Sequence, residues 1–88
     1  MTLIEKKCWP EYFQAILEGN KTFEIRLADF EAHKGDTLLL REYDPKTKQY
    51  TGRELKKQIS YIAKIDKLEK FWGKEEIEKY GIQVLALK

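Results

Sequence analysis

The sequence predicts a small α+β protein that is mostly β, and three observations lead to this class. Short segments with alternating apolar residues dominate the chain, the apolar spacing of a helix occurs in few places, and no glycine-rich phosphate loop is present. The connections are too short for a series of βαβ crossovers. A small mixed or mostly antiparallel β-barrel or half-barrel, with short helices at its ends, fits this pattern best.

The first part of the chain predicts a strand and then a helix. Residues 3–8 are interpreted as a short strand. Pro10 suits the first turn of a helix, and apolar residues at helical spacing predict a helix over residues 10–18. Gly19 follows as the residue that ends this helix, and Asn20 favours a turn there.

Strict alternation then predicts two strands. Phe23, Ile25 and Leu27 point to one side, which predicts a half-buried strand with these three side chains in the core. A turn at Gly35-Asp36 precedes a strong strand over residues 37–43, whose three consecutive leucines indicate that both of its faces are partly covered.

The second half of the chain is less regular. Residues 44–50 form a polar turn, and alternation of apolar residues predicts a strand over 58–65. Residues 67–80 are charged and helical with an interruption at Gly73, and residues 81–87 predict a closing strand. The expected order is therefore β-α-β-β-β-α-β.

Length and composition limit the function classes. The 88 residues form one domain, residues 1–88, and a net charge of +2 is too small to indicate nucleic-acid binding without local clustering. The one cysteine, Cys8, and the one histidine, His33, make a metal site or disulfide improbable, so neither metal nor cofactor is expected. The N-terminal residues carry charges and no long apolar run, which predicts a cytoplasmic protein without a membrane segment.

Arginines are scarce in this chain and therefore informative. Fourteen of the 17 basic residues are lysine, and the three arginines are Arg26, Arg41 and Arg53. The planar guanidinium recognises phosphate or carboxylate in a way that lysine does not reproduce. Arg41 is interpreted as structural, together with Cys8 and His33, whereas Arg26 and Arg53 are candidate ligand contacts.

The stretch G-N-K-T-F-E-I-R at residues 19–26 is the strongest candidate site. On a strand, Glu24 and Arg26 project from one face, and Lys21 joins them only if the backbone bends at Gly19-Asn20. The alternative is a solvated strand face with a surface ion pair worth at most ~1 kcal/mol.

These residues resemble the start of an ASCH domain, whose signature G-x-K-x-x-E-x-R matches at Gly19, Lys21, Glu24 and Arg26. The segments G-D-T-L-L-L-R-E-Y-D and Y-T-G-R-E are similar to the small ASCH-like family DUF3850. The resemblance covers about residues 5–65. It implies a PUA-like β-barrel, a cleft lined by the charged signature residues, and a role in binding RNA or a nucleotide-like ligand.

In such a cleft, Lys21 and Arg26 would hold phosphate, and Glu24 would orient Arg26 or accept from a base amino group. Trp9, beside the signature helix, is a candidate aromatic contact for an unpaired base.

A second basic cluster lies in residues 46–57. Lys46, Lys48 and Arg53, with Tyr50 between them, are candidate contacts for backbone phosphates. The alternative interpretation is a solvated turn followed by the start of a strand.

An enzyme is the second function class. Some ASCH proteins are amidohydrolases that act on N4-acetylcytidine with a lysine, a threonine and a glutamate, and ribonuclease activity is also known in the superfamily. The lysine corresponds to Lys21, the only candidate catalytic residue. The threonine position is occupied by Glu24, which removes the hydroxyl nucleophile unless Thr22 replaces it. Close pairing of Lys21 with Glu24 would favour binding over catalysis, and an isolated Lys21 in an apolar pocket would favour catalysis.

Overall fold

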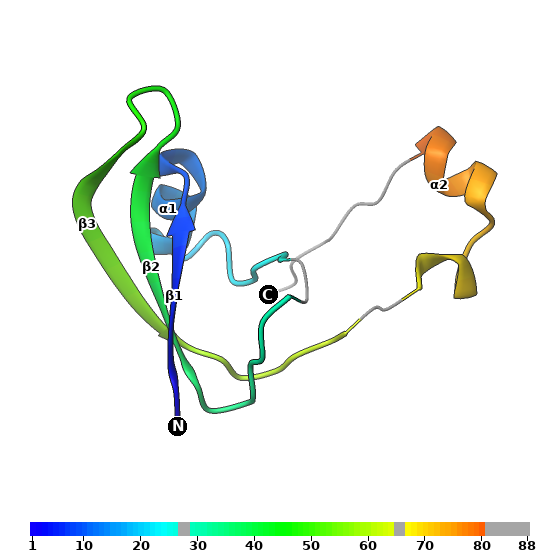
Figure 1. Cartoon of the computed structure of the whole chain (residues 1–88), viewed down its shortest axis with the longest axis horizontal. Helices are drawn as coiled ribbons and strands as arrows, with labels where there is room; N and C mark the ends of the chain where they lie inside the picture. The colour runs from blue at the N-terminus through cyan, green and yellow to red at the C-terminus, as the bar shows by residue number, and fades with distance from the viewer. Residues whose placement is uncertain (27–28, 65–66, 81–88) are drawn as a thin grey trace.

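The computed structural model describes residues 1–26, 29–64 and 67–80. In these ranges the elements follow the order β1 (Leu3–Cys8), α1 (Pro10–Leu17), β2 (Thr37–Asp44) and β3 (Gln49–Gln58), then the 3-10 helix η1 (Leu68–Lys70) and α2 (Lys74–Tyr80). The protein is α+β with more strand than helix, as the sequence predicts. Figure 1 shows the sheet and α1 together, with α2 set apart from them.

The sheet has three strands in the order β1-β2-β3. The central strand β2 pairs parallel with β1, from Leu3 opposite Thr37 onward, and antiparallel with β3. The β1-α1-β2 unit is therefore a βαβ crossover, which the short apparent connections did not predict. Within the described residues the sheet is open, so a closed barrel is not present there.

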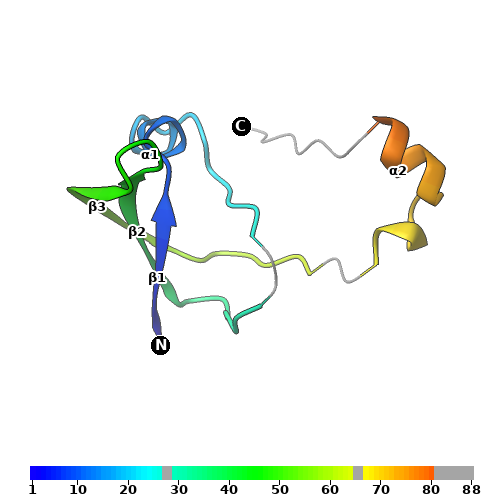
Figure 2. The same cartoon turned by 45° about the horizontal axis from the view of Figure 1, so that its top comes forward.

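The core lies between the sheet and α1. Apolar side chains of β1 and β2 meet the buried face of the helix, and this cluster consists of Cys8, Phe13, Ile16, Leu38 and Leu40. Phe13 and Leu40 are each 1% exposed. The views in Figures 1 and 2 agree that α1 covers one face of the sheet. We call the opposite face the open face.

Several predicted elements are confirmed. The strand at 3–8, the helix from Pro10 and the strand from Thr37 lie where the sequence places them. The three leucines of β2 are all buried, because Leu38 and Leu40 face α1 while Leu39 lies on the other side at 8% exposed. The helical segments on either side of Gly73 are also present as η1 and α2.

The predicted strand beginning at Phe23 is wrong. Residues 21–26 have no strand pairing, Phe23 is half-buried, and Ile25 is 66% exposed rather than in the core. Alternation alone misassigned this segment because Glu24, the polar residue between them, turns toward two basic partners. Leu27, the third residue of the pattern, lies outside the described residues.

The predicted strand over 58–65 is also wrong in its position. The third strand is β3, Gln49–Gln58, which includes the end of the segment predicted as a turn. Only Leu55 in β3 is even half-buried, so this strand shows little apolar alternation. Ile65 and the predicted closing strand over 81–87 lie outside the described residues.

Candidate functional site

The site begins where α1 ends. Gly19 has a positive φ of 82°, and the backbone N–H groups of Asn20 and Lys21 both donate to the carbonyl of Ala15 at 3.0 Å. Glycine adopts this left-handed conformation without the steric cost of a side chain. The helix end thus fixes the position from which the Lys21 side chain projects.

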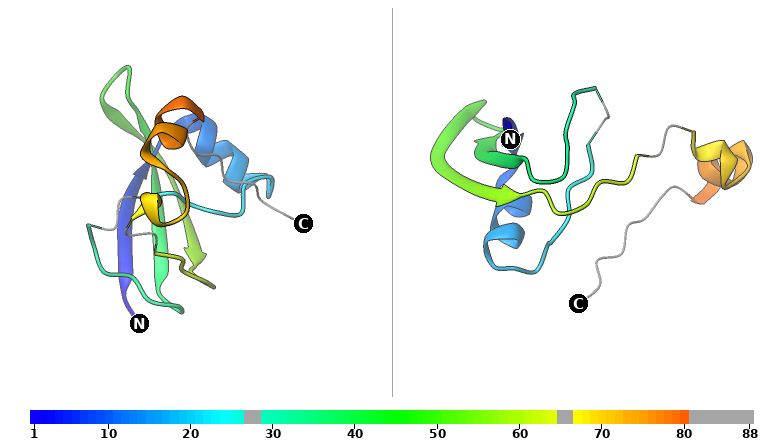
Figure 3. Two further views of the ribbon diagram at one scale, coloured as in Figure 1. Left: turned by 90° about the vertical axis from the view of Figure 1, so that its right-hand side faces the viewer. Right: turned by 90° about the horizontal axis from the view of Figure 1, so that it is seen from below.

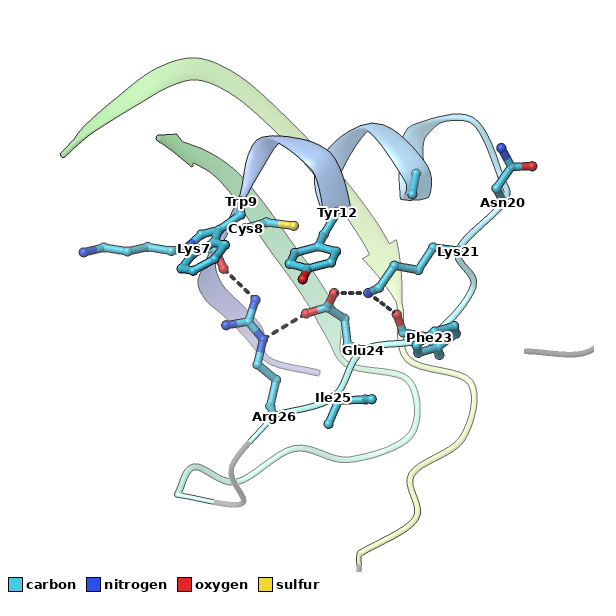
Figure 4. Close-up of a pocket in the computed structure, with 11 residues that line it drawn as sticks. Lys7, Cys8, Trp9, Tyr12, Asn20, Lys21, Phe23, Glu24, Ile25 and Arg26 are labelled. Atoms are coloured by element: carbon cyan, nitrogen blue, oxygen red, sulfur yellow. Dashed lines mark hydrogen bonds and ion pairs between the residues drawn. The ribbon is translucent and has the colours of Figure 1, made fainter. Parts of the chain in front are cut away.

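Glu24 lies at the centre of the signature residues. Its Oε1 accepts from the Lys21 Nζ at 2.8 Å, and its Oε2 accepts from the Arg26 Nε at 2.9 Å. Lys21 also donates to the carbonyl of Phe23 at 2.7 Å. The side chains of Lys21 and Glu24 are 17% and 19% exposed. One carboxylate therefore holds both cations in a partly buried place, as Figure 4 shows.

Arg26 joins this group to the sheet. Its second nitrogen, Nη2, donates to the backbone carbonyl of Lys7, which belongs to the edge strand β1. An edge strand exposes unpaired backbone groups, and this arginine occupies one of them. The segment carrying Glu24 is therefore fixed at two points, by the end of α1 and by β1.

These side chains line an open cleft of about 840 Å³. Trp9 and Tyr12, one helical turn apart, contribute stacked rings whose centroids are 6.3 Å apart and whose planes differ by 22°. Each ring is about half exposed. The full lining of the cleft consists of Lys7, Cys8, Trp9, Tyr12, Ala15, Asn20, Lys21, Phe23, Glu24, Ile25 and Arg26.

Cys8 is the buried thiol of the cleft. Burial raises its pKa, and the negative charge of Glu24 raises it further, against a smaller opposite effect of Lys21 and Arg26. A raised pKa reduces the thiolate fraction, and the thiolate is the reactive form. Cys8 therefore contributes packing to the cleft rather than a nucleophile.

Arg53, a predicted ligand contact, lies elsewhere. Its Nε and Nη2 donate to Glu42 at 3.0 and 2.8 Å, its Nη2 also donates to Gln14 at 3.1 Å, and its guanidinium lies 4.8 Å from the Phe13 ring centroid. The Thr51 hydroxyl donates to the same carboxylate at 2.6 Å. This network lowers the pKa of Glu42, mainly through the hydrogen bond from Arg53. Arg53 thus ties β3 to β2 and α1.

The other predicted contacts are also outside the cleft. Lys46 and Lys48 are exposed in the turn between β2 and β3, and Lys48 has a positive φ of 57°. Tyr50 contacts Tyr43 across the strand pair, with ring centroids 5.3 Å apart. The structure therefore brings together Trp9 and the signature residues but not the second basic cluster.

Tyr12 and Lys7 are two of the cleft residues that the sequence interpretation missed. The spacing of Tyr12, three residues after Trp9 on a helix, was the available signal, because such residues lie on one helix face. The contribution of Lys7 is a backbone carbonyl, for which side-chain identity carries no signal.

The described ranges hold neither a metal cluster nor a membrane-spanning helix. In residues 1–26, 29–64 and 67–80, no group of three or more potential ligands is arranged to hold a metal ion. Over the same described residues, no helix has both the length and the apolar character needed to cross a bilayer.

The fold and the site define a small α+β protein with a charged and aromatic cleft beside its sheet. The chain belongs to the family described as "Domain of unknown function (DUF3850)", which matches residues 4–72. It is 36% identical over 59 residues to the "Uncharacterized 12.9 kDa protein in GpA 3'region" of Escherichia phage P2. That match covers 67% of this chain and 52% of the phage protein, so the chain spans about half of that relative's length. No solved structure matches the chain significantly.

Proposed function

We propose that this protein is an RNA- or nucleotide-binding domain of the ASCH type and that its ligand occupies the cleft of Lys21, Glu24 and Arg26. The observation that carries the proposal is the single carboxylate of Glu24 holding both cations beside two half-exposed aromatic rings. Paired and anchored cations keep their positions before a ligand arrives, which reduces the entropy lost on binding.

The cleft retains hydrogen-bond donors after its internal bonds are made. A guanidinium carries five N–H groups and an ammonium three. Arg26 uses Nε for Glu24 and Nη2 for Lys7, and Lys21 donates to Glu24 and Phe23. The remaining donors suit phosphate oxygens or the carbonyls of a base. The exposed rings of Trp9 and Tyr12 suit stacking of an unpaired base.

The ASCH assignment includes a PUA-like barrel, of which the mixed sheet with α1 packed on one face would form a part. The signature residues support this assignment, because Gly19 bends the chain so that Lys21 reaches Glu24 and Arg26. In the proposed barrel, the cleft lies beside the edge strand β1.

Binding is favoured over hydrolysis by the surroundings of Lys21. Its ammonium is paired with Glu24 at 2.8 Å rather than isolated in an apolar pocket. None of the residues that line the cleft is a serine or threonine, and Thr22 is not among them. The raised pKa of Cys8 also disfavours a thiolate nucleophile. A hydrolase would therefore need a different source of nucleophile in this cleft.

The test measures the binding of a single-stranded RNA by fluorescence anisotropy. The RNA has about ten nucleotides, which is within the range that one small barrel covers. We expect affinity to fall steeply with salt, because lysine and arginine displace counterions from phosphates. Arg26→Ala should weaken binding by about tenfold or more, since it removes charge-assisted hydrogen bonds. Thermal melting of each variant shows that the fold is retained.

The matched control is Lys79→Ala on α2, which removes one positive charge away from the cleft. Its affinity should remain within about twofold of wild type if the signature site, rather than total charge, binds RNA. The proposal is overturned if RNA does not bind at low salt and the protein instead hydrolyses N4-acetylcytidine in a manner lost with Lys21→Ala.

A further inference from the structure

A second group of cations and rings lies on the open face of the sheet. Register places Lys7 of β1 opposite Arg41 of β2, and Tyr43 of β2 opposite Tyr50 of β3. Side chains alternate along a strand, and Leu38 and Leu40 face α1, so Arg41 and Tyr43 lie on the other face. Figure 3 shows this sheet with α1 on only one of its sides.

The geometry of this group is that of cations held over aromatic rings. The Arg41 guanidinium lies 3.9 Å from the Tyr50 ring centroid, and the Lys7 Nζ lies 4.3 Å from the Tyr43 ring centroid. The two rings meet edge to face at 71°. Tyr50 is 40% exposed, so part of the group is available to a ligand.

In the part of the chain that the structure describes, these two cations make ion pairs and ring contacts but no side-chain hydrogen bond. Arg41 lies 3.4 Å from Glu54 and 3.7 Å from Glu5, but its Nε is buried and makes no hydrogen bond. Within the described residues, Lys7 has aromatic contacts and no carboxylate within ion-pair distance. The Arg41 side chain is 31% exposed, so an oxyanion would contact its exposed part, beside the Lys7 ammonium, rather than the buried Nε.

Lys7 connects this group to the cleft. Its backbone carbonyl accepts from Arg26 inside the cleft, while its side chain extends away from the cleft toward Tyr43, as Figure 4 and the ring distance show. A chain molecule bound at Arg26 therefore needs only to cross the edge strand β1 to reach the open face.

We propose that the open face is a second contact for the same single-stranded RNA, with a base against Tyr50 and a phosphate held by Lys7 and Arg41. This inference rests on the proposed function of the cleft. The carboxylates of Glu5 and Glu54 flank Arg41, so these two acids and the two cations together carry no net charge. Among the residues that the structure describes, Lys7 is the cation of this group that has no carboxylate within ion-pair distance, and it is the one that favours an anionic ligand. Aromatic stacking accepts any base, and the site therefore extends the RNA footprint without adding sequence preference.

The test compares two RNAs of the same composition, one of about three nucleotides that fills the cleft and one of about ten that also reaches the open face. Tyr50→Leu and Arg41→Gln should each weaken the longer RNA by about tenfold, the loss expected for one stacked base or one charged contact, and leave the shorter RNA unchanged. Neither Tyr50 nor Arg41 lines the cleft, so the cleft stays intact in both variants. Lys79→Gln is the charge-matched control and should change neither affinity.

The outcomes separate this inference from the proposed function. If both RNAs bind and depend on Arg26 but neither variant weakens the longer one, the second contact is wrong and the cleft proposal stands. If both variants weaken the two RNAs equally, the open face does not add a contact and the inference is again overturned. If neither RNA binds to wild type, both proposals fail.

Discussion

The two halves of this protein have similar compositions and different degrees of burial. The C-terminal arm, residues 60–64 and 67–80, contains eight apolar residues among its 19, a share similar to the 42% of the whole chain. None of these 19 residues is buried, and Tyr61, Phe71 and Tyr80 are 82%, 63% and 74% exposed. The sheet and α1 bury all of the core residues. Figure 3 shows the arm extending away from the sheet.

The difference arises from arrangement rather than from apolar content. Helix α1 is eight residues long and places Phe13 and Ile16 on one face, against strands that come from before and after it. Helix α2 has seven residues and no buried side chain. Isolated helices of this length are marginal in water, and most helix stability in proteins comes from packing against other elements.

The largest expected contrast is in amide hydrogen exchange. The Leu40 amide lies in the central strand and should exchange only through global unfolding, at a cost of about 5 kcal/mol or more. The Ile77 amide bonds to the Gly73 carbonyl at the start of α2 and should exchange through local opening at close to zero cost. Equal protection of the two amides, measured by NMR, would show that the arm is packed as firmly as the sheet.

Two phenylalanine substitutions test the same contrast by stability. Phe13→Ala should destabilise the protein by about 3–5 kcal/mol, because it removes a fully buried ring. Phe71→Ala should change the free energy of unfolding by less than about 0.5 kcal/mol, because its ring is exposed. Urea unfolding at neutral pH measures both. A large effect of Phe71→Ala would place the arm in the cooperative unit.

The buried carboxylate of Glu42 makes the stability of the sheet and α1 depend on pH. Its folded pKa is lowered by Arg53 and Thr51, so its contribution is full above the unfolded pKa of about 4.3 and is lost as pH falls through the lower folded pKa. Glu42→Gln should lower stability at pH 7 by about 1–2 kcal/mol and by much less at acidic pH. Chemical denaturation at several pH values measures this, and a variant that loses as much stability in acid as at pH 7 would exclude the linkage.

The smallest expected difference is between two cleft residues, Phe23 and Ile25, and it concerns the free energy of unfolding. Phe23→Ala should cost about 1–2 kcal/mol, because the ring is only half-buried and its backbone carbonyl, which binds Lys21, is retained. The neighbouring Ile25→Ala should cost less than about 0.5 kcal/mol, because Ile25 is 66% exposed. If Ile25 proved the more costly of the two, the assignment of the cleft faces would be reversed.

The sequence predicts the elements whose signals are local. The strand at 3–8, the helix from Pro10 and the leucine-rich strand each carry an apolar pattern or a helix start that needs no distant partner. The strand β3 was misplaced because its residues are mostly polar and exposed, and its position depends on pairing with β2. Alternation at Phe23 and Ile25 predicts a strand, but the hydrogen bonds of Glu24 determine the segment's actual course.

The candidate site was predicted in part for the same reason. Lys21, Glu24 and Arg26 are close in sequence, and the bend at Gly19 is a local property, so their proximity could be derived from spacing. The internal partner of Arg53 is not evident from the sequence, because Glu42 lies on the neighbouring strand, across an irregular register between Arg41 and Tyr43. A scarce arginine indicates a carboxylate or phosphate partner, but not whether that partner belongs to the protein.

The parallel pairing of β1 with β2 has a consequence for the order of folding. Strands β2 and β3 are joined by a short turn, and hairpins of this kind form within about 1–10 μs. The pairing of β1 with β2 must first close a loop that contains α1 and the signature residues, and such non-local contacts form later. The Arg26 contact to Lys7 needs β1 in place, so we expect the cleft of Lys21, Glu24 and Arg26 to be completed among the last steps of folding.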